Sequence, residues 1–65
     1  MQVFINQIPR EWPEDTTLAQ ALQAMDFVPP FAVAINLQFV PKTQYSHTAL
    51  KHGDQIEVIS PITGG

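Results

Sequence analysis

The stretch Gly53-Asp54-Gln55-Ile56-Glu57-Val58-Ile59 joins a turn signal to a run of alternating side chains. Glycine followed by aspartate is typical of a turn, because both residues tolerate the backbone angles that reverse a chain. Successive side chains of a strand point to opposite faces, so Ile56 and Val58 share one face. Glu57 and Ile59 share the other. The stretch therefore predicts a last strand, over residues 55–59, with one face in the core.

The N-terminal segment predicts two further strands with a turn between them. Residues 2–6 alternate as a strand does, which places Phe4 on the face opposite its apolar neighbours. Asn6-Gln7 fits a tight turn, although it lacks the favoured Asn-Gly pair. Residues 8–12 would return as the second strand. Prolines at 9 and 13 lack the N–H that a sheet ladder needs, so this strand is expected at a sheet edge.

A helix is predicted after the second strand. Thr16 or Thr17 can cap it, and Thr17 with Gln20 three residues later matches a capping box. The apolar residues that follow recur at i, i+3, i+4 and i+7, which is one face of a helix: Leu18, Ala21, Leu22 and Met25. The helix is expected to end between Asp26 and Pro30, because proline cannot continue it.

Two short strands and an irregular segment are expected between the helix and the last strand. Residues 31–36 form an almost continuous apolar run, which indicates a strand that is buried on both faces, or one with a buried face and a face used for contact. A turn over residues 36–38 leads to a short strand at Phe39-Val40, which Pro41 ends. The polar segment 42–52 is predicted to be irregular, with Tyr45 and Leu50 as core anchors.

This order of elements predicts an α+β fold with two layers. One helix on one face of a mixed sheet of four to five strands would bury both apolar patterns. The simplest pairing puts the first and last strands side by side in the centre and the proline-bearing strand at an edge. The two central strands would be parallel if the helix returns the chain to the same side. That is the β-grasp, or ubiquitin-like, topology. We expect one domain over residues 1–60 and a flexible tail over residues 61–65.

Composition argues against several classes of function. The sequence has no cysteine, which excludes disulfides, thiolate metal sites and a cysteine nucleophile. The net charge of −3 argues against a nucleic-acid partner, which would need a basic patch. No apolar run is long enough for a membrane span, and no signal peptide is recognised, so a cytoplasmic location is expected. His47 and His52 alone make a poor metal site, and no bound metal or cofactor is expected.

The sequence ends in Gly64-Gly65, directly after the last apolar stretch. Glycine has no Cβ and accepts nearly any backbone angle, so such a tail can enter a narrow tunnel and present a bare carboxylate. A frayed chain end without function is the alternative interpretation. A domain too small for a deep pocket is nonetheless well suited to carry chemistry at its end.

Three outward side chains predict a contact surface. Phe4, Ala34 and Ile59 are expected on the sheet face opposite the helix, where water would otherwise lie. With Pro61 and Ile62 they would form an apolar patch that leads to the tail. Exposed contiguous apolar surface usually marks a binding site, so we interpret these residues as a partner-docking surface.

Taken together, these segments resemble the ThiS family of small sulfur carriers in thiamin biosynthesis. The resemblance covers the whole chain and rests on residues 2–6, Thr16-Thr17-Leu18, Ala32-Val33-Ala34-Ile35-Asn36, Phe39-Val40-Pro41, residues 53–58 and Gly64-Gly65. The segment 32–36 and the short length favour this family over the related small subunit of molybdopterin synthase, MoaD. The segment 8–14 carries more proline and tryptophan than the family pattern.

The resemblance implies a protein co-substrate that is not itself an enzyme. A ThiF-like adenylyltransferase would use ATP to adenylate the carboxylate of Gly65, with Gly64 as the flexible link. A sulfur donor, such as a cysteine desulfurase or a persulfide carrier, would then replace AMP and leave a thiocarboxylate. A ThiG-like thiazole synthase would accept that sulfur.

Other functions remain open at this point. A MoaD-like carrier for molybdopterin would differ only in its acceptor enzyme. A non-covalent ubiquitin-like interaction module would carry its two terminal glycines incidentally. A ubiquitin-like protein conjugated to lysines is a third alternative.

Overall fold

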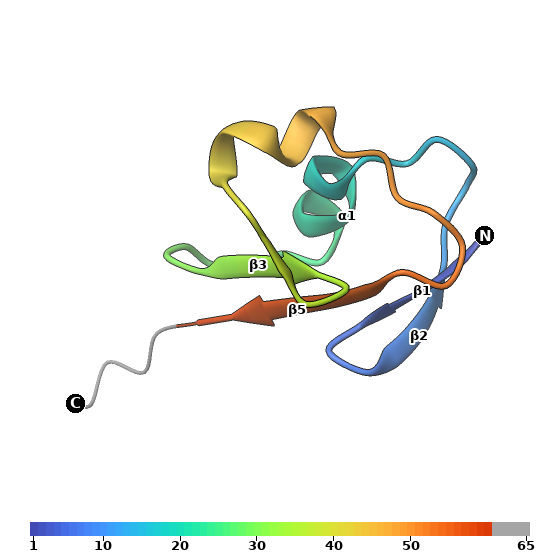
Figure 1. Ribbon diagram of the computed structural model, residues 1–65, viewed down its shortest axis with the longest axis horizontal. Coiled ribbons are helices and arrows are strands. Elements are labelled where there is room, and N and C mark those ends of the chain that lie inside the picture. Colours follow the sequence, from blue (N-terminus) through green and yellow to red (C-terminus); the bar gives the residue numbers. More distant parts are fainter. Residues whose placement is uncertain (61–65) are drawn as a thin grey trace.

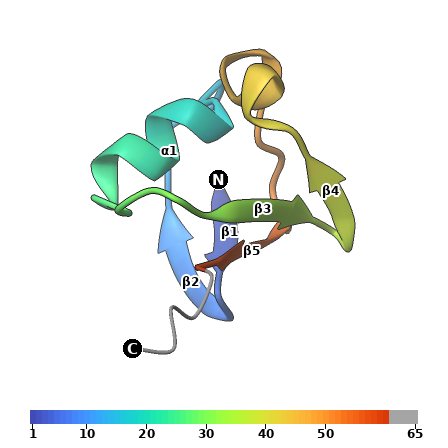
Figure 2. The same cartoon turned by 90° about the vertical axis from the view of Figure 1, so that its left-hand side faces the viewer.

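Five strands and one main helix form two layers in the computed structural model, which describes residues 1–60. The strands are β1 (Gln2–Ile5), β2 (Ile8–Glu11), β3 (Ala32–Ile35), β4 (Gln38–Val40) and β5 (Gln55–Ile59). Helix α1 (Leu18–Ala24) lies over one face of the sheet, with the 3-10 helix η1 (Lys42–His47) beside it (Figures 1 and 2). The predicted tail, residues 61–65, lies outside the described residues.

The sheet has the strand order β2-β1-β5-β3-β4. Strands β1 and β5 pair in parallel at its centre, and the other neighbours pair antiparallel. The predicted β-grasp topology is therefore confirmed. Strand β2, which carries Pro9, lies at the edge of the sheet. No strand pairs with its outer side, so the missing N–H of proline is tolerated there.

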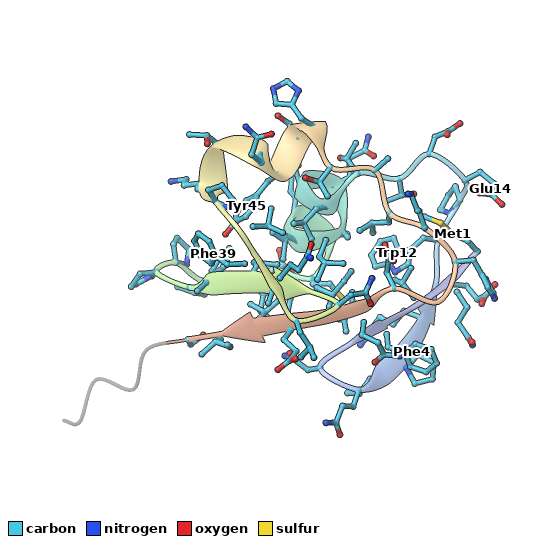
Figure 3. All side chains as sticks on the ribbon, viewed as in Figure 1. Met1, Phe4, Trp12, Glu14, Phe39 and Tyr45 are labelled. Carbon is cyan, nitrogen blue, oxygen red and sulfur yellow. The ribbon has the colours of Figure 1, made fainter. Side chains whose placement is uncertain are left out.

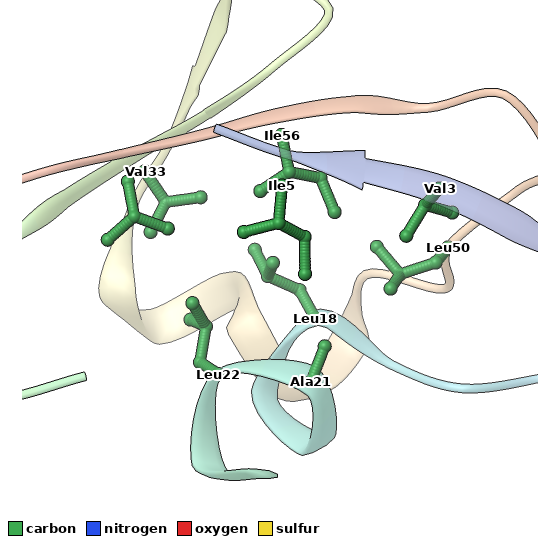
Figure 4. Packing of buried hydrophobic residues seen from close by; sticks show 9 residues of the cluster. Val3, Ile5, Leu18, Ala21, Leu22, Val33, Leu50 and Ile56 are labelled. Atoms are coloured by element: carbon green, nitrogen blue, oxygen red, sulfur yellow. The ribbon is translucent and has the colours of Figure 1, made fainter. Parts of the chain in front are cut away.

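The core lies between α1 and the helix-facing side of the sheet (Figure 4). Alternation along β1 and β5 buries Val3, Ile5, Ile56 and Val58, as the sequence predicts. The helix contributes three of its four predicted apolar residues as buried side chains, and Met25 packs half-buried at the margin. The core residues are Val3, Ile5, Leu18, Ala21, Leu22, Val33, Leu50, Ile56 and Val58.

The start of α1 is fixed from two sides. Thr17 is the N-cap, and its side chain and that of Gln20 complete the predicted capping box. The backbone N–H of Leu18 donates to the Thr48 carbonyl at 2.8 Å, and the N–H of Leu50 donates to the Thr16 carbonyl at 2.9 Å. These bonds tie the start of the helix to the segment that follows η1.

Two sequence predictions between α1 and β5 are wrong in detail. The turn after β3 has two residues, since Ile35 pairs with Gln38 and both Asn36 (φ 50°) and Leu37 (φ 70°) have the positive φ of a type I′ turn. Gln38 therefore belongs to β4. The segment predicted to be irregular contains η1, which begins after Pro41. A single 3-10 segment of six residues leaves no apolar periodicity to detect.

Within residues 1–60, α1 and η1 are both far too short to span a lipid bilayer.

Candidate functional site

The sheet face opposite α1 has no second layer over it among residues 1–60 (Figure 2). Strand register determines which side chains point to this open face. Ala34 pairs with Glu57, and Ala32 pairs with Ile59. All four therefore lie on the side opposite to the buried Val33 and Val58.

Apolar side chains gather at the β4-β3-β5 end of the open face. Ala34 lies diagonal to Ile59 across the β3–β5 pair, and Ile59 is 55% exposed. Phe39 pairs with Ala34, lies on the same side of the β3–β4 hairpin, and is 70% exposed. Ala32 lies beside Ile59. The sequence pattern predicts Ala34 and Ile59 on this face but does not identify Phe39 or Ala32.

Phe4 lies on the open face as predicted, but apart from this group. It pairs with Gln55 on one side and Pro9 on the other, so it stands four positions along β5 from Ile59, about 13 Å. Glu57 projects between them. Figure 3 shows Phe4 and Trp12 on opposite sides of the sheet. The predicted patch is thus divided into two parts, and the acidic Glu57 separates them.

Charge on the open face is negative. Glu57 points to this face, and so does Glu11, which pairs with Gln2. Arg10 pairs with the buried Val3 and therefore lies on the helix side. The two lysines are in η1 and in the loop before β5. An apolar face bordered by carboxylates fits a partner surface that is apolar and basic.

Strand β5 is held on both sides by asparagines that begin two-residue turns with positive φ. One turn follows β1 at Asn6-Gln7, and the other follows β3 at Asn36-Leu37. Asn6 donates its N–H to the Ile56 carbonyl at 2.8 Å, and its Oδ1 accepts the Val58 N–H at 2.9 Å. Asn36 donates its N–H to the Gln55 carbonyl at 2.8 Å, and its Oδ1 accepts the Gln55 N–H at 3.0 Å. The asparagine side chains thus replace backbone partners where β1 and β3 turn away, and they fix the strand that precedes the tail.

The Asn6 side chain is expected to stabilise the fold, and the adjacent turn position offers a matched control. Asn6→Gly keeps the positive φ (51°) but leaves the part-buried Val58 N–H without its acceptor. We expect a loss of about 1–3 kcal/mol in the free energy of unfolding, measured by urea denaturation. Gln7→Gly, at φ 71°, removes no such bond and should leave stability unchanged or raise it. Equal destabilisation by both changes would contradict this role of Asn6.

The two histidines show no grouping suited to metal binding. His52 accepts the Gln2 N–H through Nδ1 at 3.1 Å, and His47 is exposed near the end of η1. Among residues 1–60, no three side chains of the ligating types lie close enough together to hold a metal ion. Trp12 packs half-buried against the core, and its Nε1 is buried without a hydrogen-bond partner in the described part of the chain.

The predicted tail residues Pro61, Ile62, Gly64 and Gly65 lie outside the described residues. Their starting point is known, because β5 ends at Ile59 beside Ala32. The loop before β3 lies at this same end of the molecule, and Met1 lies at the opposite end (Figure 1). The last described residue of the chain therefore lies at the end that carries Ile59.

Comparison with known proteins identifies the family. The sequence model of the ThiS family matches residues 3–65. The chain belongs to the ThiS family. A solved structure similar to this ThiS-family chain is the thiamine biosynthesis protein ThiS from Geobacter metallireducens, with a TM-score of 0.85, 22% sequence identity and coverage of 100% of both chains. That likeness confirms the fold. No curated protein sequence is significantly similar to this chain.

The position of Phe39 in this ThiS-family chain follows from a register that the sequence signals only weakly. A two-residue turn after Ile35 places Phe39 opposite Ala34, whereas a three-residue turn does not. Leucine at positive φ is uncommon, so Leu37 gives no turn signal. Asparagine is the first residue of both turns, Asn6 and Asn36, and this repeat is the one sequence signal that indicates a two-residue turn after Ile35.

Proposed function

We propose that this chain is a sulfur carrier in thiamin biosynthesis and acts as a protein co-substrate. The observation that carries the proposal is the ThiS-family match, which runs from residue 3 through the Gly64-Gly65 pair. Residues 1–60 form a two-layer support, and the proposed reactive group is the carboxylate of Gly65.

The proposed chemistry begins with activation of the carboxylate. One oxygen of the Gly65 carboxylate attacks the α-phosphate of ATP on a ThiF-like adenylyltransferase, and pyrophosphate leaves. The acyl-adenylate then has AMP as a leaving group, which the free carboxylate lacks. Gly64 and Gly65 have no side chains to obstruct the approach to phosphorus. ATP is thus a substrate of the partner, and this chain supplies only the carboxylate.

Sulfur enters in the second step. The outer sulfur of a persulfide donor, such as a loaded cysteine desulfurase, attacks the acyl carbon and AMP leaves. A thiol then reduces the remaining S–S bond, which frees the thiocarboxylate and oxidises the thiol to a disulfide. A ThiG-like thiazole synthase accepts the sulfur from the thiocarboxylate.

The open face is the proposed docking surface for the adenylyltransferase. Its apolar group, namely Ala32, Ala34, Phe39 and Ile59, borders the end of β5, so a partner that covers it is placed to receive the tail. Phe4 would contact the same partner farther along the face, and Pro61 and Ile62 would continue the contact toward the nucleotide. The carboxylate of Glu57 would meet a basic residue of the partner.

Ile59→Asp is expected to weaken adenylation without unfolding the domain. The change places a carboxylate in the apolar group and should raise the carrier concentration for half-maximal ATP–pyrophosphate exchange by about tenfold or more. Ile8→Asp is the matched control, because Ile8 is also 55% exposed but pairs with Ile5 on the helix side. Thermal unfolding verifies that both variants fold. Unchanged exchange kinetics for Ile59→Asp would exclude this docking surface.

A further inference from the structure

A groove on the helix side of the sheet opens between α1, the loop that follows it and η1. Its volume is about 230 Å³, and its wall includes Leu22, Phe27, Phe31, Tyr45 and Lys42. A second hollow of about 210 Å³, lined by Pro29, Pro30, Phe31, Lys42 and Tyr45, shares three of these residues. The two hollows adjoin through these shared residues, and together we call them the flank groove.

Aromatic contacts give the flank groove a fixed wall. The rings of Phe31 and Tyr45 are nearly parallel, with centroids 6.3 Å apart and planes inclined by 7°. Phe27 contacts Phe31 at 6.1 Å with an inclination of 55°. All three side chains are only half-buried, although they pack against the core. Rings that fix one another while keeping one side accessible form a preorganised apolar binding wall.

Lys42 gives the flank groove a positive charge. It is one of three basic residues in a chain of net charge −3, and its side chain is exposed. No residue that lines either hollow is acidic. The flank groove thus combines an apolar wall with one lysine and has no carboxylate in its lining. It complements a ligand in which an anionic group lies beside an apolar side chain. The acidic open face has the opposite charge preference.

The flank groove lies at the end of the molecule from which the tail departs. Phe31 also lines a surface hollow with Pro30, Ala32 and Ile59, so apolar surface runs from the open face around the start of β3 into the groove. Figure 2 shows the start of β3, the end of α1 and the beginning of η1 facing the viewer together with the end of β5. The flank groove and the end of β5 thus lie at the same end of the molecule.

We infer that the flank groove is a second docking site for the adenylating partner, an inference that rests on the proposed function. Its occupant is a segment of that partner with an apolar or aromatic side chain next to a carboxylate. The apolar side chain enters between Leu22 and the rings of Phe27 and Tyr45, and the carboxylate pairs with Lys42. The partner thus contacts the carrier on both sides of the start of β3. One contact is with the acidic open face, and the other is with the basic flank groove.

Charge reversal and steric filling test the inference in the intact chain. Lys42→Glu repels the proposed carboxylate, and Gln23→Tyr places a ring across the groove from an exposed position of α1. Each should raise the KM for the carrier in ATP–pyrophosphate exchange by about tenfold, and added salt should reduce the effect of Lys42→Glu. The controls are Lys51→Glu and Gln44→Tyr, which make the same exchanges at exposed positions outside the groove. They should change KM by less than about twofold.

The outcomes separate this inference from the proposed function. The second docking site is supported if the wild-type chain is adenylated, both groove variants have a raised KM and both controls have a normal KM. If the wild-type chain is adenylated and both Lys42→Glu and Gln23→Tyr have a normal KM, the second docking site is excluded. The proposed carrier function is then unaffected. An equal effect of Lys51→Glu also excludes the second docking site, because net charge alone would then account for the change. A wild-type chain that is not adenylated overturns both proposals.

Discussion

Deletion of Gly65, or addition of one alanine after it, is expected to reduce adenylation to background. Either change moves the carboxylate by one residue, about 3.3–3.6 Å along an extended chain. A misplacement of even about 1 Å can cost 10²-fold in rate when reactants must be held in line. The measurement is ATP–pyrophosphate exchange with the adenylating enzyme at saturating ATP.

The control for tail length adds the same alanine before Met1. That end of the molecule lies opposite the end of β5 (Figure 1), so adenylation should remain at the wild-type rate. The hydrophobic core lies entirely within residues 3–58, so the temperature of unfolding should be unchanged in all three variants. Full adenylation of the chain without Gly65 would show that the position of the terminal carboxylate does not matter and would contradict the role proposed for Gly65.

Leu18→Ala is expected to remove a large share of the free energy of unfolding. Leu18 is 0% exposed at the start of α1, and it packs between the helix and the sheet (Figure 4). Loss of a buried leucine side chain typically costs about 2–5 kcal/mol in the free energy of unfolding. Typical stabilities of about 0.05–0.15 kcal/mol per residue correspond to roughly 3–10 kcal/mol for a domain of this length. The substitution therefore removes much of the total stability.

Urea denaturation followed by circular dichroism measures this loss. Leu37→Ala is the control, because it removes the same atoms from a side chain that is 87% exposed. It should change the free energy of unfolding by less than about 0.5 kcal/mol. If the two variants lose equal stability, the core is not assembled as described.

Sequence pattern predicted the elements whose signals are local. Alternation in β1 and β5, the Thr17–Gln20 capping box and the edge position of the proline-bearing strand are all confirmed. Each depends on a side-chain period or on hydrogen-bonding groups that one segment carries by itself. The parallel pairing of β1 with β5 was expected if the helix returned the chain to the same side of the sheet, and this pairing is confirmed.

Features that depend on register or on distant packing could not be read in the same way. The two-residue turn at Asn36-Leu37 sets which side chains of β4 stand opposite those of β3. The register between β1 and β5 separates Phe4 from the group around Ile59. The flank groove combines residues of α1, the following loop and η1, which lie up to 26 positions apart in the sequence, from Ala19 to Tyr45. The sequence around Phe27 indicates that the helix ends there, but it gives no sign that Phe27 lines a groove.

Intact-protein mass spectrometry tests the proposed sulfur-carrier function most directly. The chain is incubated with a ThiF-like adenylyltransferase, ATP and a persulfide donor, and a thiol reductant is added before the spectrum is recorded. A sulfur carrier gains the mass difference between one sulfur and one oxygen, and fragmentation places that gain on Gly65. An unchanged mass, under conditions in which another ThiS-family carrier gains sulfur, would contradict the proposed function.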